Sequence, residues 1–390
     1  MEKVKTGIIG VGNMGYAHAK ALFDGEIDTM QLCALCDTDE KRREVLKADF
    51  PGIPVFKNHG QLLESGLCDA VVIATPHRFH SLIACEALDA GLHVLTEKPE
   101  DVTVSAAQTL NEKARKSGLV FGIMFNQRTN PLFARAREIV KSGALGAPKR
   151  LVWIITNWYR TQAYYDSGTW RATWKGEGGG VLLNQAPHNL DLWQWIFGMP
   201  QKIRAVCETA KYHNIEVEDD AAIYAEYANG ATAVFLTTTG EYPGTNRLEI
   251  SGDMGKIVLE DGKLKHWRLS VHERDYCFSA SLADKKPDVE YEEYIAEASE
   301  EAHRAILRNF SRAVLYGEEL LAPGYDGINE LSISNAAYLS SWTGEAVTLP
   351  FDTEKFDALL EEKRRTGKDM SDKKTQEEKS GYKKRWDVNW

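Results

Sequence analysis

The sequence predicts two domains: an α/β domain with a doubly wound parallel sheet, then an α+β domain with a large, open, mostly antiparallel sheet. Three observations support this prediction. The chain has 390 residues, more than one ordinary core accommodates. Strand and helix patterns alternate over the first 125 residues, as in repeated βα units. After about residue 150, strands rich in aromatic and β-branched residues dominate.

The first domain, residues 1–125, is expected to alternate strands with helices. The apolar run over 70–74 has no polar interruption, which indicates a strand buried on both faces of a parallel sheet. Further strands are expected at 4–9, 30–36, 93–96 and 119–125, and helices at 15–23, 39–48, 79–90 and 105–117.

The second domain is expected to span residues 126–350 and to be followed by a charged C-terminal extension, 351–390. Asn229-Gly230 between two apolar runs predicts a hairpin. The expected strands are 150–156, 221–227, 232–238, 247–251 and 256–260, with helices at 185–197, 297–316 and, in the extension, 354–365. The chain ends in a polar segment with Trp386 and Trp390, and two alternatives stay open for it: docking onto a surface such as a neighbouring subunit, or a frayed end.

Composition excludes several classes of function. The net charge of −10 disfavours a general role on nucleic acid or at a membrane surface. No apolar stretch approaches the ~20 residues that span a bilayer, and the N-terminus runs directly into a strand without a signal region. A cytoplasmic location is therefore expected. Cys33 and Cys36 lie three apart on an expected strand and point to opposite faces, so we expect buried thiols and no metal site.

A glycine-rich turn joins the first strand to the first helix. It reads Gly10-Val11-Gly12-Asn13-Met14-Gly15, and in this context GxGxxG is typical of a dinucleotide-binding Rossmann domain. Its N–H groups and the positive helix end are expected to face a pyrophosphate. Asp37 ends the second strand, where a carboxylate binds the ribose hydroxyls and repels a 2′-phosphate. NAD is therefore favoured over NADP, although Lys41, Arg42 and Arg43 lie nearby and soften this preference.

Further motifs follow in a fixed order. They are Ala74-Thr75-Pro76-His77-Arg78-Phe79-His80, Glu97-Lys98-Pro99, the segment 126–131, Trp170-Arg171 and the segment 178–191. Together they resemble the glucose–fructose oxidoreductase / inositol dehydrogenase (Gfo/Idh/MocA) family over roughly residues 5–350. The resemblance implies an NAD-dependent oxidoreductase that moves a hydride between nicotinamide and a secondary hydroxyl of a sugar, cyclitol or sugar derivative.

The resemblance also implies roles for individual residues. Lys98 and His188 are expected to handle the hydroxyl proton. Asn184 stands where the family has an aspartate, four residues before His188, on what is expected to be one helical face. Asn184 either binds a substrate hydroxyl or orients the imidazole, or it only caps the helix that Pro187 begins. Asp191 either bonds the imidazole or is a polar helix position.

The remaining expected contacts divide between cofactor and substrate. Besides the glycine turn and Asp37, the cofactor contacts are Thr75, Pro76, His80, Glu97 and Lys98. The substrate contacts are Trp170, Arg171 and Arg128, together with Asn184 and Asp191. Aromatic residues and Arg160 between positions 153 and 174 suit a sugar ring, whose C–H faces lie on aromatic rings, although part of this set is core packing.

Three functional hypotheses remain open from the sequence. The first is a dehydrogenase that exchanges soluble NAD. The second is a redox-recycling enzyme whose tightly bound NAD transiently oxidises a sugar or glycoside to enable elimination or glycoside cleavage. The third, a non-enzymatic NAD-binding regulator, is disfavoured by Lys98 and His188 and by the lack of a basic DNA-reading segment. We expect a sugar, glycoside or cyclitol substrate, no nucleic-acid or membrane partner, and a homodimer or homotetramer, because relatives bury the open sheet face against another subunit.

Overall fold

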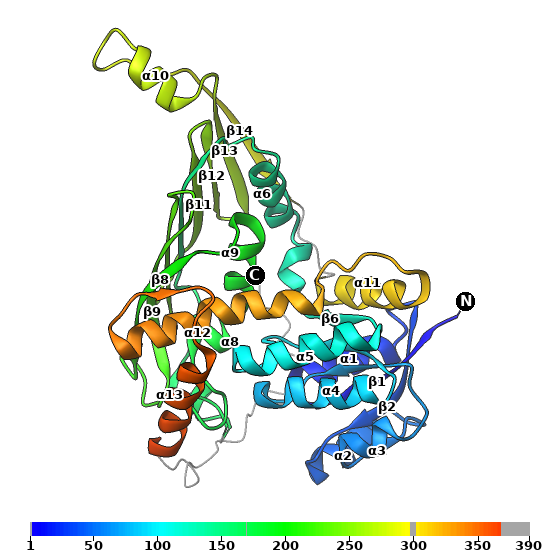
Figure 1. Ribbon diagram of the computed structural model, residues 1–390. Helices are drawn as coiled ribbons and strands as arrows, with labels where there is room; N and C mark the ends of the chain where they lie inside the picture. Colours follow the sequence, from blue (N-terminus) through cyan, green and yellow to red (C-terminus); the bar gives the residue numbers. More distant parts are fainter. Residues whose placement is uncertain (1, 169, 297–301, 368–390) are drawn as a thin grey trace.

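Two sheets organise the chain, a parallel sheet near the N-terminus and a larger mixed sheet that extends away from it (Figure 1). The computed structural model describes residues 2–168, 170–296 and 302–367. Each sheet has its own apolar core, and helices from later parts of the chain pack against both.

The first sheet has six parallel strands in the order β3-β2-β1-β4-β5-β6, which confirms the predicted doubly wound sheet. The central strand β4 is buried along its whole length, as its apolar sequence requires. The strands are β1 (Val4–Ile9), β2 (Met30–Cys36), β3 (Val55–Phe56), β4 (Ala70–Ile73), β5 (His93–Thr96) and β6 (Phe121–Ile123). The connecting helices are α1 (Asn13–Phe23), α2 (Glu40–Asp49), α3 (His59–Leu63), α4 (His80–Asp89) and α5 (Val104–Ser117), with a 3₁₀ turn η1 (His77–Phe79) before α4.

The second sheet has nine strands in the order β14-β13-β12-β11-β7-β10-β9-β8-β15. The β7–β10 pair is parallel and the other pairs are antiparallel, so the predicted mostly antiparallel sheet is confirmed. The Asn229-Gly230 hairpin joins β9 to β10. The strands are β7 (Pro148–Ile155), β8 (Lys202–Thr209), β9 (Glu218–Glu226), β10 (Thr232–Thr238), β11 (Asn246–Gly252), β12 (Gly255–Glu260), β13 (Lys263–Leu269), β14 (Val289–Ile295) and β15 (Val347–Thr348).

Helices cover one face of the second sheet. The helices of this part of the chain are α6 (Pro131–Lys141), α7 (Gln162–Tyr165), α8 (Val181–Asn184), α9 (Pro187–Phe197), α10 (Glu273–Ser279) and α12 (Gly327–Thr343), with 3₁₀ turns η2 (Asn126–Thr129) and η3 (Gly324–Asp326). Trp193 of α9 stacks on Phe235 of β10 with ring centroids 5.8 Å apart, which fixes α9 to the sheet centre. On the opposite face Val206 and Tyr224 are exposed, so that face is left open.

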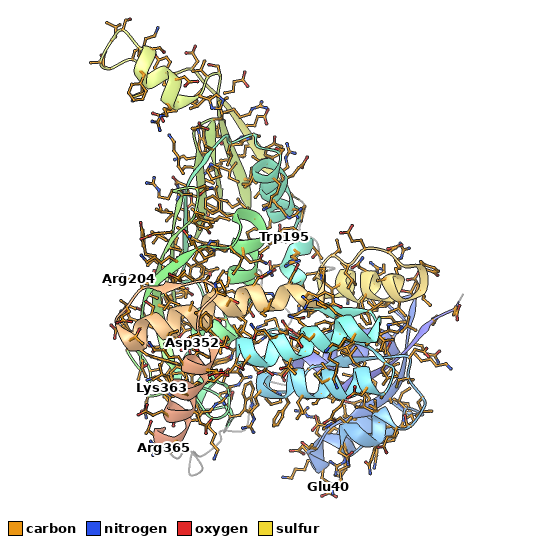
Figure 2. All side chains as sticks on the ribbon, in the orientation of Figure 1. Glu40, Trp195, Arg204, Asp352, Lys363 and Arg365 are labelled. Carbon is orange, nitrogen blue, oxygen red and sulfur yellow. The ribbon has the colours of Figure 1, made fainter. Side chains whose placement is uncertain are left out.

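Two helices near the C-terminus pack on different cores. Helix α11 (Ala302–Tyr316) buries Ile306, Leu307 and Phe310 in the core of the first sheet. Helix α13 (Thr353–Thr366) is capped by Asp352 (Figure 2). Its Phe356 stacks on Trp342 in the second core. Helix α11, which follows strand β14 of the second sheet in the sequence, thus packs on the core of the first sheet. The beginning of the expected helix at 297–316 and the tail with Trp386 and Trp390 lie outside the described residues.

Two smaller observations bear on the expectations from composition. Over the described ranges, every helix is too short or too polar to cross a membrane. The Cys33 and Cys36 side chains do not meet: the Sγ atom of Cys33 lies 2.8 Å from that of Cys68, and Cys36 is buried among apolar residues.

Candidate active site

The turn after β1 leaves room for a ligand beside its backbone. Gly10 has φ +84°, and a Cβ added to it would lie 2.7 Å from the Thr75 nitrogen. A Cβ added to Gly12 would meet no atom within 4 Å, so this residue faces open space. Helix α1 begins at Asn13 without a side-chain cap. Its first N–H groups therefore remain available to an anion such as a pyrophosphate.

Asp37 lies at the end of β2, next to this turn. One carboxylate oxygen accepts from the Val11 N–H at 3.0 Å, and the other accepts from the Asp39 N–H at 2.9 Å. Arg43 donates to the carbonyl oxygens of Asp37 and Thr38 at 3.0 and 2.7 Å, so its guanidinium is bonded to the backbone rather than free for a 2′-phosphate. The residues present fit NAD.

His80 joins the two other loops at this edge of the sheet. Its ring nitrogens lie 2.7 Å from the carbonyl oxygens of Thr75 and Pro99. The loop after β4 and the loop after β5, which carries Lys98, are thereby held together. The Thr75 hydroxyl is buried and has no hydrogen-bond partner among the described residues, as expected of a group that binds an external polar ligand.

Glu97 forms a buried pair with His18 of α1, with Oε1 and Nε2 2.7 Å apart. Burial alone would raise the pKa of Glu97, but the hydrogen bond and charge of His18 prevail and hold that pKa at about 2. Helix α1, which carries the phosphate-binding turn, is therefore linked by this pair to the residue next to Lys98.

Lys98 reaches from the first domain into the second. Its Nζ donates to the backbone carbonyl of Asn184 at 2.8 Å. Burial lowers the pKa of Lys98 and the nearby Arg160 adds to this effect, while Glu97, Glu330 and Glu177 oppose it. A lysine with a lowered pKa releases its proton more readily than an exposed lysine, which suits a proton-transfer role.

His188 is buried near the start of α9, with its ring 6.4 Å from that of Phe125. Burial and the charge of Lys98 lower its pKa well below the ordinary value. The imidazole is therefore neutral at pH 7. The structure brings Lys98 and His188 together at the junction of the two domains.

Asn184 and His188 do not share one helix. Asn184 ends α8, and α9 begins at Pro187 with Ala186 as its N-cap, so the alternative that Asn184 caps this helix is wrong. The Asn184 amide instead donates to a Glu177 carboxylate oxygen and to the Tyr164 hydroxyl, the latter at 3.3 Å. The expectation that the two residues lie on a single helix is therefore wrong.

Glu177 is a site residue that the sequence analysis missed. It is buried, and its second oxygen accepts from the Ala172 N–H at 2.6 Å. Ala172 has φ +56°, uncommon for a residue with a side chain, and this bond helps hold it. Burial raises the pKa of Glu177, while the charge of Arg171 opposes the shift most strongly. The available signal was a single acidic residue inside a run of glycines, 176–180.

Trp170 and Arg171 lie at the same site. The Trp170 ring meets the edge of the His77 ring at 6.0 Å. The Arg171 guanidinium lies 4.7 Å from the Trp170 ring centre and 4.8 Å from that of Tyr164, and it donates to the Tyr164 hydroxyl at 3.0 Å. Tyr164 thus connects Arg171 to Asn184.

Arg128 and Asp191 are placed elsewhere. They form two hydrogen bonds to each other, at 2.6 and 2.9 Å, and both side chains are 1% exposed. Arg128 also donates to Asp326 at 2.7 Å. The two charges thus form a buried link between η2, α9 and η3, and the substrate contacts expected for both residues stay predictions.

Comparisons with known proteins agree with this architecture. The family model for an oxidoreductase family with an NAD-binding Rossmann fold matches residues 4–125, and that for a GFO/IDH/MocA C-terminal domain matches residues 133–258. The chain is 24% identical to scyllo-inositol 2-dehydrogenase (NAD(+)) of Bacillus subtilis, over 89% of this chain and 96% of the relative. It is also 24% identical to myo-inositol 2-dehydrogenase of Thermotoga maritima, over 86% and 95%.

A solved structure gives the same result for the fold. The WlbA dehydrogenase of Bordetella pertussis, in complex with NADH and UDP-GlcNAcA, superimposes with a TM-score of 0.75 at 25% identity, over 90% of this chain and 100% of that one. The glycine turn, the NAD-binding domain and both family matches lead to one conclusion: the chain is an NAD-binding oxidoreductase and belongs to the GFO/IDH/MocA family.

Proposed function

We propose that this protein is an NAD-dependent dehydrogenase that oxidises a secondary hydroxyl of a sugar, cyclitol or sugar derivative, with Lys98 and His188 handling the hydroxyl proton. The observation that carries the proposal is that Lys98, which donates to the Asn184 carbonyl, lies close enough to His188 for its charge to lower the pKa of the buried imidazole. Two relatives named as inositol dehydrogenases and a neighbour in complex with a sugar nucleotide support the substrate class.

The two side chains have complementary tasks. Bound NAD supplies the hydride acceptor. The lowered pKa of Lys98 favours the amine form, which can accept the hydroxyl proton as the carbinol carbon loses hydride. His188 is neutral and can bond the same oxygen as donor or acceptor. The Lys98 to Asn184 bond fixes the amine, and the adjacent residue Glu97 is held by its buried pair with His18.

We further propose that Trp170, Arg171 and the Asn184 amide bind the sugar ring and its hydroxyls. Tyr164 connects Arg171 and Asn184, which supports a single contact surface around the reacting carbon. A homodimer or homotetramer that covers the open face of the second sheet, where Val206 and Tyr224 are exposed, completes the proposal.

The test is a screen of the purified protein with NAD against inositols, aldoses and glycosides, read as NADH absorbance. We expect reduction with at least one of them, and a loss of that signal in Lys98→Met. NAD binding, followed by quenching of protein fluorescence, should survive in the variant. NAD binding without NADH formation on any polyol would contradict the proposal. A nicotinamide absorbance carried by the protein as purified would instead favour the redox-recycling hypothesis.

A further inference from the structure

Arg160, in the segment between β7 and α7, holds a positive charge that no carboxylate of the described residues pairs. Its guanidinium lies 5.1 Å from the Tyr164 ring centre and 5.9 Å from that of Trp158. It donates to the neighbouring Tyr159 carbonyl at 3.1 Å, and its Nε is buried without a hydrogen bond. In the described part of the chain no carboxylate forms an ion pair with it. Partly buried charges are ordinarily paired, so this one is available to a ligand.

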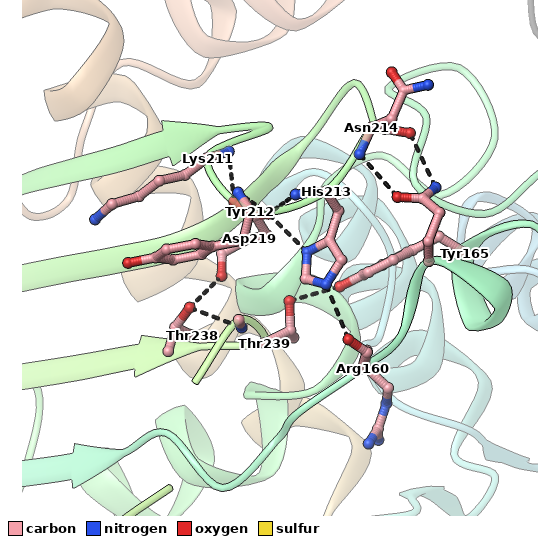
Figure 3. A network of polar contacts seen from close by, with 11 residues as sticks. Arg160, Tyr165, Lys211, Tyr212, His213, Asn214, Asp219, Thr238 and Thr239 are labelled. Atoms are coloured by element: carbon pink, nitrogen blue, oxygen red, sulfur yellow. Dashed lines mark hydrogen bonds and ion pairs between the residues drawn. The ribbon is translucent and has the colours of Figure 1, made fainter. Parts of the chain in front are cut away.

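The backbone of Arg160 is fixed on both sides (Figure 3). Its N–H donates to the Thr239 carbonyl at 2.9 Å, and its carbonyl accepts from His213 Nε2 at 2.9 Å. His213 Nδ1 lies 2.8 Å from Asp219, a fully buried carboxylate. Asp219 also accepts the N–H groups of residues 211–213, at 2.9 to 3.0 Å. Two buried side chains thus hold one exposed segment in place, and the Arg160 side chain points away from them.

Two further basic side chains lie close to this guanidinium. Arg171 lies 4.8 Å from the same Tyr164 ring. Arg160 is near enough to Lys98 to disfavour its protonated form. Glu177 acts on both Lys98 and Arg171, and Glu97 and Glu330 also act on Lys98. Arg160 is therefore a basic group of this cluster that no carboxylate of the described residues pairs, and an anionic substrate would neutralise its charge.

We propose that the substrate carries an oxyanion, a carboxylate or a phosphate ester on the sugar or cyclitol, and that Arg160 binds it. This inference rests on the proposed function and adds the substrate class. A guanidinium presents paired N–H donors that match the oxygens of either group. The aromatic rings of Trp158 and Tyr164 exclude water from one side of the guanidinium, which strengthens its attraction for an anion.

The experiment compares three forms of one hexose: the neutral sugar, its uronate and its 6-phosphate, in the gluco, galacto and manno series. Two quantities are measured, kcat/KM with NAD and the Kd for the NADH-loaded enzyme by titration calorimetry. We expect at least one acidic form to bind about tenfold or more tightly than its neutral parent, as for a charge-assisted hydrogen bond. Whichever acidic form binds more tightly than the neutral sugar shows whether the site takes a carboxylate or a phosphate ester. Its KM should rise with NaCl, while the KM of the neutral sugar should not.

Arg160→Met should lose this preference in KM and Kd, and Arg160→Lys should keep part of it. Because Arg160 also lowers the pKa of Lys98, kcat is compared between each acid and its neutral parent within the same variant. Arg274→Met, an arginine of α10 far from the site, is the matched control and should keep all of it. The inference is overturned if the wild type binds the neutral sugar as tightly as both acids, or if Arg160→Met, folded by thermal melting, retains the preference. If NADH forms from neutral sugars alone, the proposed dehydrogenase function holds and the proposed oxyanion site is excluded. If an acid binds in an Arg160-dependent way but no NADH forms, the oxyanion site holds and the proposed dehydrogenase function is contradicted.

Discussion

Replacing Arg128 separates a structural role from a substrate contact. Arg128→Met removes two hydrogen bonds to Asp191, one to Asp326 and one at 3.2 Å to the Leu321 carbonyl. Asp191 then keeps the hydrogen bond from Gln194 but loses its counterion, while its own side chain is only 1% exposed to solvent. Breaking a buried pair from one side costs about 3–5 kcal/mol. With an unfolding entropy of about 2.1 cal/mol/K per residue, that loss lowers the melting temperature of a chain of this length by about 4–6 °C.

The assay is thermal unfolding, with KM for NAD and for the substrate measured on the same preparations. Arg312→Met, which breaks an exposed pair with Glu318, is the control and should shift the melting temperature little. The double variant Arg128→Met/Asp191→Leu leaves no buried charge from the pair and should recover much of the loss. An unchanged melting temperature with a raised KM for the substrate in Arg128→Met would refute the structural assignment.

Three other predictions follow from the site. Lys98→Met should lower kcat about 10²- to 10⁴-fold while NAD still binds and the fold still melts cooperatively; wild-type turnover would exclude the proton role. Asp37→Ala should weaken NAD binding much more than NADP binding, measured as the ratio of KM values, and an unchanged ratio would exclude contact with the ribose. Glu97 has a pKa held at about 2 against 4.5 in the unfolded chain, so its ionised form stabilises the protein above pH 4.5, and that contribution is lost as the pH falls towards 2. Glu97→Gln should therefore lower the free energy of unfolding by about 3 kcal/mol at pH 7 and less at pH 3, measured by urea unfolding; an equal difference at both would contradict the pair with His18.

The fold could be predicted where the sequence pattern is local. The apolar run at 70–74 identifies a central parallel strand, and Asn229-Gly230 identifies a hairpin. Strands β8, β13 and β14 were missed. Their burial patterns mix exposed and half-buried positions, because they lie towards the edges of an open sheet. Helix α11 was expected, but its packing on the first core depends on distant residues that no local pattern specifies.

The site divides in the same way. Gly10, Asp37 and Lys98 stand at strand ends, where the sequence motif and the position in the fold coincide. The positions of Arg128 and Asp191 could not be predicted, because motif spacing does not reveal that two charged side chains from different elements neutralise each other. Arg160 was only one candidate within an aromatic-rich segment. The structure singles it out because His213 and Asp219 fix its backbone, and these residues lie more than 50 positions away along the chain.

The pairing of Asn184 with Glu177 connects these observations. An aspartate at position 184, as the family resemblance suggests, would direct a second carboxylate at Glu177, and two carboxylates at hydrogen-bond distance cannot both stay ionised. The amide instead donates a hydrogen bond, so Glu177 can keep its charge beside Lys98. Glu177 also holds the Ala172 N–H and so the segment that carries Arg171. Asn184 is therefore better understood as half of a pair whose negative charge lies at position 177 than as a lost catalytic acid.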